Sequence, residues 1–147
     1  AKHKGTSFVE IYQNCNIFND GTFSAIYERS VREDRILRLK HGEVLVFGKD
    51  KNKGIRMRGL KPVIVDLDKD FNEKDLLIHD QYCEDSALAN LLSGFDYPDF
   101  PVPMGIFRQV ENSTYGEKIE EQIKTQIEKK GVGNLAKLLR GNQVWTN

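Results

Sequence analysis

Cysteine, proline and long apolar runs are all scarce in this sequence of 147 residues. Its two cysteines, Cys15 and Cys83, lie far apart and form neither a C-x-x-C motif nor a disulfide framework, which favours a reducing, cytoplasmic location. No apolar run approaches the length that spans a membrane, and no signal peptide is visible, so we expect no membrane partner. A glycine-rich loop that could cradle phosphate groups is also absent from the sequence.

Charge of one sign does not dominate either, because 22 Lys and Arg balance 22 Asp and Glu. This neutrality argues against a nucleic-acid partner. The charges are unevenly spread, however: residues 1–60 carry 12 basic and 7 acidic residues, whereas residues 61–147 carry 10 and 15. The excess of cations in the first part fits a docking surface or an anionic ligand, and it fits equally a protein with two differently solvated faces.

What the sequence does contain is enough apolar material for one folded domain with a modest core, at 39% hydrophobic and 10% aromatic residues. Residues 6–12 are apolar on both faces and predict a buried β-strand, which ends in polar residues around Cys15. An Asn-Asp-Gly turn signal follows at residues 19–21. The end of a strand in an open sheet is a common place for a functional site.

Short strands are predicted next, at residues 36–39 and 44–47 as a hairpin, then at 55–58, 62–67 and 76–79. A short helix is expected within residues 22–29, and Asp85 can cap another that Gly94 ends. The segment 95–104 contains three of the four prolines and is expected to be irregular.

Two helices close the chain. Thr114 and Glu117 form a capping-box pattern before a helix with isoleucines on one face, and Gly131 ends it. Asn134 can cap a last short helix.

Many separated stretches, in the same order, resemble the C-terminal part of the β subunit of 2-oxoacid:ferredoxin oxidoreductases, especially the 2-oxoglutarate type. They extend from about residue 3 to about residue 122. The matching stretches are HKGTSFVEIYQNC (3–15), IFNDG (17–21), SVREDR (30–35), VFGK (46–49), KGIR (53–56), PVPMGIFR (101–108) and ENSTY (111–115).

The resemblance implies a mixed α+β fragment of an α/β subunit. Residues 1–20 would end the thiamine-diphosphate-binding domain with the last strand of its sheet, and residues 21–147 would form the C-terminal region of short hairpin strands and helices. The family pairs this subunit with an α subunit and binds thiamine diphosphate with Mg²⁺ and a [4Fe-4S] cluster. It converts a 2-oxoacid and coenzyme A to an acyl-CoA and CO₂, and it reduces ferredoxin.

The sequence departs from that family pattern because it has neither the Gly-Asp-Gly motif nor the N-terminal C-x-x-C. We therefore expect the chain alone to be inactive. A non-enzymatic interaction domain derived from the same family is the alternative.

By the resemblance, Cys15 matches the fourth cysteine ligand of the cluster, and an inert thiol is the alternative. Cys83 matches no family ligand and is expected to pack near a helix start. Asn19 and Asp20 follow the cluster strand and could face the cofactor, although Asn-Asp-Gly is first of all a turn.

A run of five cations in ten positions could bind the phosphates of coenzyme A, the carboxylates of the substrate or an acidic ferredoxin. A solvated loop is the alternative. These residues are Lys49, Lys51, Lys53, Arg56 and Arg58. The three histidines are scattered and predict no metal site.

Overall fold

The computed structural model describes residues 3–69 and 73–141, which form two compact units. The larger unit is Glu10–Val110, and the second contains residues 3–9 and 111–141. Helices and strands occur together, so the predicted α+β class is confirmed. The domain boundary predicted at residue 20 concerns the full-length family fold and stays a prediction.

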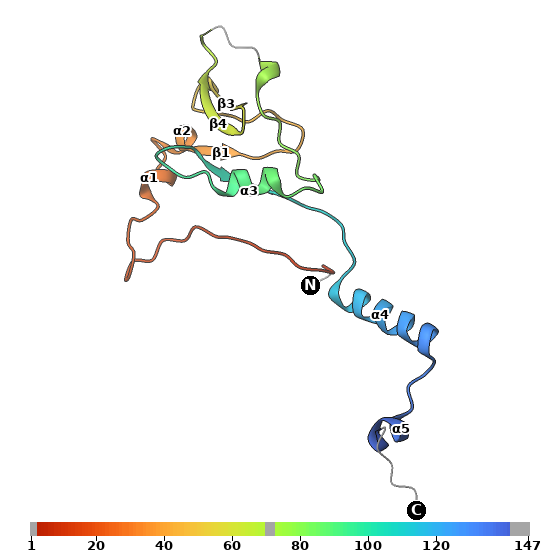
Figure 1. Cartoon of the computed structure of the whole chain (residues 1–147). Helices are drawn as coiled ribbons and strands as arrows, with labels where there is room; N and C mark the ends of the chain where they lie inside the picture. The colour runs from red at the N-terminus through yellow and green to blue at the C-terminus, as the bar shows by residue number, and fades with distance from the viewer. Residues whose placement is uncertain (1–2, 70–72, 142–147) are drawn as a thin grey trace, which may run out of the picture. The chain divides into compact units, whose positions relative to one another are not determined.

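The described residues of the larger unit form three short helices, a 3-10 turn and five strands. They follow one another along the chain, and Figure 1 shows α1, α2, β1, β3, β4 and α3 gathered in this unit. The elements are α1 (Ser24–Tyr27), α2 (Arg32–Arg35), β1 (Ile36–Arg38), β2 (Val46–Phe47), β3 (Lys53–Arg58), β4 (Lys61–Asp66), η1 (Glu73–Asp75), α3 (Ala87–Ser93) and β5 (Val102–Met104).

Two small sheets organise this unit. Strand β1 pairs in parallel with β5, with Ile36 opposite Val102. Strands β2, β3 and β4 form an antiparallel sheet in that order, and β3 and β4, which correspond to the strands predicted at 55–58 and 62–67, pair as a hairpin with Arg58 opposite Lys61. The hairpin predicted between residues 36–39 and 44–47 is wrong, because β1 and β2 belong to different sheets.

One apolar cluster lies among these sheets and α3. Its buried members come from β1, β2, β3, α3 and the segments beside them, and backbone bonds such as Leu45 N–H to Leu77 O (2.8 Å) connect the segments. The predicted strand at residues 76–79 is reduced to a single bridge between Val44 and Ile78. The cluster consists of Leu37, Leu39, Leu45, Phe47, Ile55, Leu92 and Phe95.

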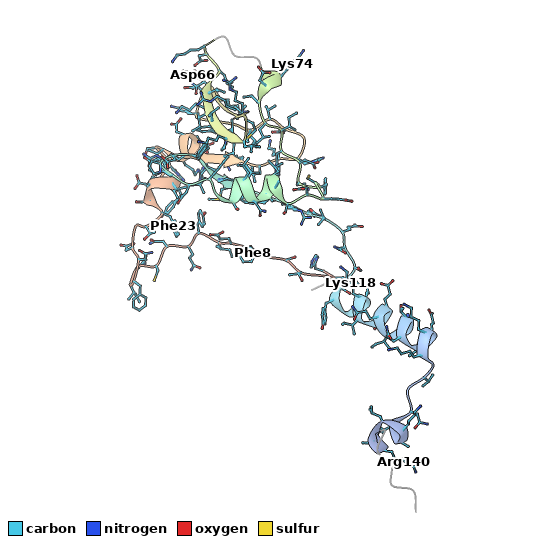
Figure 2. The ribbon with its side chains drawn as sticks, viewed as in Figure 1. Phe8, Phe23, Asp66, Lys74, Lys118 and Arg140 are labelled. Atoms are coloured by element: carbon cyan, nitrogen blue, oxygen red, sulfur yellow. The ribbon has the colours of Figure 1, made fainter. Side chains whose placement is uncertain are left out.

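The strand predicted at residues 6–12 is not formed in the structure. The segment is exposed and has no strand partner among the described residues, with Phe8 90% exposed and labelled in Figure 2. An apolar strand needs neighbours at its edges to satisfy its backbone, and no described element supplies them.

The C-terminal helices of the second unit agree with the prediction. Helix α4 (Tyr115–Lys130) starts with the Thr114–Glu117 capping box, and Gly131 follows its last residue. Asn134 caps the start of α5 (Leu135–Arg140). Neither helix contains a buried residue. Among the described residues, no helix has the length and apolar character needed to cross a membrane.

Candidate functional site

Cys15 lies in a tight loop that joins the extended N-terminal segment to α1. The Asn19 N–H donates to the Cys15 carbonyl oxygen at 2.9 Å, which makes a local bridge between these two residues. At the base of the loop, the Tyr12 ring stacks on Phe23 with centroids 4.9 Å apart and planes 2° apart. The sequence turns here because Asn, Asp and Gly follow one another and Gly21 adopts a φ of 74°.

The side chain of Asn14 crosses this loop. Its Nδ2 donates to Asn16 Oδ1 at 2.8 Å and to Asp20 Oδ1 at 2.9 Å, and its Oδ1 accepts from the Gly21 N–H at 2.9 Å. One amide therefore connects both ends of the loop around Cys15.

The thiol of Cys15 is exposed, and backbone N–H groups face it. Hydrogen bonds from the N–H of Phe18, then Ile17, and less strongly Asn19, lower the pKa of Cys15 below the ordinary thiol value, against a small opposing effect of desolvation. Hydrogen bonding to the charged form favours that form. The loop thus favours the thiolate, which is the state that binds iron.

Asn19 and Asp20, predicted to face a cofactor, both belong to this loop. Asp20 accepts the bond from Asn14, and the Asn19 carbonyl oxygen accepts from Thr22 Oγ1 at 3.1 Å. These bonds agree with the interpretation of Asn-Asp-Gly as a turn, and contact with thiamine diphosphate stays a prediction.

The donor set around Cys15 fits one ligand of an iron–sulfur cluster and not a complete site. A [4Fe-4S] cluster takes four thiolates, but in the described part of the chain no three His, Cys, Asp or Glu side chains gather as a metal site. Cys83 is half-buried and unbonded to Cys15, and its carbonyl oxygen accepts from Arg108 Nε at 3.1 Å.

The predicted basic run is divided by the structure. Lys49 and Lys51 lie in the loop before β3, and alternation along the strand places Lys53 on one face and Arg56 and Arg58 on the other. Lys53 Nζ lies 5.9 Å from the centre of the Phe47 ring. The structure therefore gathers Arg56, Arg58 and the opposing Lys61 near one end of the β3–β4 sheet.

Two residues have roles that the sequence reasoning missed. The sequence placed Asn14 only within the segment that resembles the family, because the hydrogen-bond partners of its side chain follow no regular spacing along the chain. His79, one of the three scattered histidines, is fully buried, and its Nε2 lies 2.8 Å from the Ile106 carbonyl oxygen. The apolar run Leu76-Leu77-Ile78 before it was the available signal for burial.

Comparison with known proteins then tests the resemblance. The chain is 31% identical over 154 aligned residues to 2-oxoglutarate oxidoreductase subunit KorB of Mycobacterium tuberculosis, an alignment that covers 99% of this chain. The predicted resemblance to this oxidoreductase subunit is confirmed. The chain spans 39% of the length of that relative. No family model matches the chain, and no solved structure matches it.

Proposed function

We propose that this chain is part of the β subunit of a 2-oxoacid:ferredoxin oxidoreductase that acts on 2-oxoglutarate. The reaction is the oxidative decarboxylation of the 2-oxoacid with coenzyme A to an acyl-CoA and CO₂, with transfer of electrons to ferredoxin. The observation that carries this proposal is similarity along 99% of the chain to a 2-oxoglutarate oxidoreductase subunit. The loop around Cys15 supports it, since its backbone N–H groups favour a thiolate.

Cys15 is the residue of this chain that holds the cluster. When bound, thiamine diphosphate supplies the electron sink for decarboxylation and the [4Fe-4S] cluster supplies one-electron transfer. Cys15 contributes one thiolate, and the remaining ligands and the thiamine-diphosphate motif come from other parts of the assembled enzyme. The chain alone is therefore inactive, and a reducing cytoplasm keeps its exposed thiol free.

The basic end of the β3–β4 sheet is the part of this chain suited to an anionic partner. Arg58 and Lys61 are exposed and directly opposed, and Arg56 lies on the same face. Cations on such a surface raise the association rate of acidic proteins and of phosphate-bearing ligands. Ferredoxin or coenzyme A is the proposed partner of this surface, and the α subunit is the proposed partner of the chain as a whole.

The experiment is to express the complete β subunit with its α subunit and to replace Cys15 by Ala, with Cys83→Ser as the matched control. We expect Cys15→Ala to lose iron, acid-labile sulfide and the cluster's electron paramagnetic resonance (EPR) signal. It should also lose most of the CoA-dependent reduction of a viologen dye by 2-oxoglutarate under anaerobic conditions. The control should keep both, because Cys83 matches no cluster ligand in the resemblance to the family.

Equal cluster content and turnover in wild type and Cys15→Ala would overturn the role of Cys15. A wild-type assembly with neither cluster nor turnover would instead favour the alternative, a non-enzymatic interaction domain that keeps the family sequence.

A further inference from the structure

One side chain closes the loop that presents Cys15. Asn14 bonds to Asn16, to Asp20 and to the backbone N–H of Gly21, all at 2.8 to 2.9 Å. The Tyr12–Phe23 stack closes the base of the loop separately. The loop is therefore held by three sets of contacts: the Asn19 N–H bond to the Cys15 carbonyl oxygen at 2.9 Å, the side-chain bonds of Asn14, and the Tyr12–Phe23 stack. Of these, the bonds that join residue 14 to residues 20 and 21 depend on the Asn14 side chain.

The partners of Asn14 require an amide of this length. The Gly21 N–H can only donate, and the Asp20 carboxylate can only accept, so the side chain between them must carry one acceptor and one donor. An aspartate at this position would accept from Gly21 but would repel Asp20. Alanine would make neither bond, and glutamine would be one methylene longer.

The closure by Asn14 has a direct consequence for the backbone at residues 17–19. The Asn14 bonds to Asp20 and Gly21 act together with the Asn19 N–H bond to the Cys15 carbonyl oxygen, and they hold the intervening chain in a tight turn. The N–H groups of Ile17 and Phe18 in this turn face the Cys15 sulfur. Without the Asn14 bonds, the turn would depend on the single Asn19–Cys15 backbone bond, and the N–H groups of Ile17 and Phe18 would open to water more often.

We propose that Asn14 is a positioning residue that holds the 14–21 loop in the conformation in which backbone N–H groups donate to the Cys15 sulfur. This inference rests on the proposed function, in which that sulfur is a cluster ligand. Hydrogen bonds to the sulfurs of a cluster stabilise its reduced, more negative state and therefore raise its reduction potential. Asn14 thus sets both the geometry of the ligand and the potential of the cluster.

The first test uses the metal-free 147-residue chain. Amide hydrogen exchange of Ile17, Phe18 and Gly21, followed by NMR, should be about tenfold faster in Asn14→Ala, because these amides open more often when the tie is lost. Asn112→Ala, which removes an exposed amide from another part of the chain, is the matched control and should leave these rates unchanged. Equal rates in Asn14→Ala and wild type would overturn the proposal.

A reciprocal exchange then tests the donor and acceptor argument. Asn14→Asp alone should loosen the loop, because the introduced carboxylate would repel Asp20. The double variant with Asp20→Asn should recover the slow exchange, because the new amide donates to the new carboxylate while the Gly21 N–H keeps its acceptor. Failure of the double variant to recover would overturn the assignment of these bonds.

The second readout is the reduction potential of the cluster in the assembled enzyme, measured by redox titration of its EPR signal. Asn14→Ala should shift the potential to a more negative value, and the double variant, which has the same net charge as wild type, should return towards the wild-type value. A loosened loop with an unchanged potential would overturn the tuning role and leave Cys15 as ligand. Retention of the cluster in Cys15→Ala would instead overturn the role of Cys15 as a ligand in the proposed function, while the amide-exchange result would still stand for Asn14.

Discussion

At the scale of single residues, the close approach of two backbone segments requires glycine at position 105. Gly105 follows β5 with a φ of 139°, and a Cβ there would lie 2.8 Å from the Leu39 carbonyl oxygen. The Leu39 N–H in turn donates to Met104 O at 2.9 Å, so this glycine lies where β1 and β5 are tied together. A side chain would meet backbone that cannot move without breaking the parallel pair.

Gly105→Ala should therefore lower the free energy of unfolding by about 1–3 kcal/mol, since the φ is strained for any residue with a Cβ. Urea unfolding followed by far-UV circular dichroism measures this change as a lower midpoint. The control is Gly116→Ala in the first turn of α4, where a Cβ meets nothing within 4 Å and helix propensity favours Ala. A midpoint for Gly105→Ala equal to that of Gly116→Ala would contradict the argument.

At the scale of elements, α4 is stabilised by local interactions. It has no buried residue, and its capping box joins Thr114 Oγ1 to the Glu117 N–H at 3.3 Å and Glu117 Oε2 to the Thr114 N–H at 2.7 Å. Removal of a cap costs about 1 kcal/mol of helix stability. Because no buried face compensates for that loss, the first turn of α4 depends on this cap.

Thr114→Ala should weaken the start of α4 and lower the helical signal at 222 nm, with faster amide exchange at residues 117 and 118. Thr125→Ala removes a threonine from the interior of the same helix and should leave the signal unchanged or raise it, because Ala is the better helix former. The same loss of helicity in both variants would show that the cap has no special role.

The capping box also gives α4 a pH dependence. The Thr114 N–H and hydroxyl, which bond to the Glu117 carboxylate, hold its pKa below the ordinary value. The helix is therefore stabilised fully above the ordinary carboxyl pKa of about 4.3. This stabilisation is lost as the pH falls through the lowered pKa.

Acid titration of the 222 nm signal should show this loss in wild type. Glu117→Gln keeps the hydrogen bond to the Thr114 N–H, but glutamine does not titrate. The part of the pH dependence that comes from residue 117 should therefore vanish in this variant. Identical acid transitions in the two proteins would exclude Glu117 as the titrating group.

The contrast between these helices and the strands explains which features could be predicted from the sequence. The capping box at Thr114, the cap at Asn134 and the glycine stops act over a few residues, so their signals are contained in a short stretch. The strands at residues 55–58 and 62–67 were predicted from similarly short stretches, although their pairing as a hairpin was not. The pairing of β1 with β5 is not local, and the sequence offers no signal that joins residues 36–38 to residues 102–104.

In the candidate site, too, local features could be predicted from the sequence and non-local contacts could not. Cys15 and the turn after it were found from the residue types and the resemblance to the family. The role of Asn14 depends on which partners its amide meets, and only the folded loop reveals them. The apolar pattern of residues 6–12 indicated a strand, but a strand is a paired structure, and no described element pairs with it.

At the scale of the whole chain, burial is concentrated in the larger unit. The core cluster and the apolar side chains packed against it all come from residues 37–107. The second unit exposes most of its large apolar residues, among them Leu138 at 78%. Cooperative stability of the described chain should therefore belong to the larger unit.

A matched pair of leucine truncations tests this division. Leu45, 1% exposed in the core cluster, should cost about 2–5 kcal/mol when replaced by Ala, because a cavity adds to the lost burial. Leu138→Ala should change the free energy of unfolding by less than about 0.5 kcal/mol, since its side chain is already in solvent.

Limited trypsin digestion with mass spectrometry gives a second measurement, in which the wild-type chain should be cut first in α4 and α5, where Lys124, Lys129 and Lys137 are exposed. The larger unit should resist cleavage in wild type and in Leu138→Ala and become susceptible in Leu45→Ala, because cleavage follows the population of the open state. A Leu138→Ala protein destabilised as much as Leu45→Ala would show that α5 shares the core's cooperative unfolding.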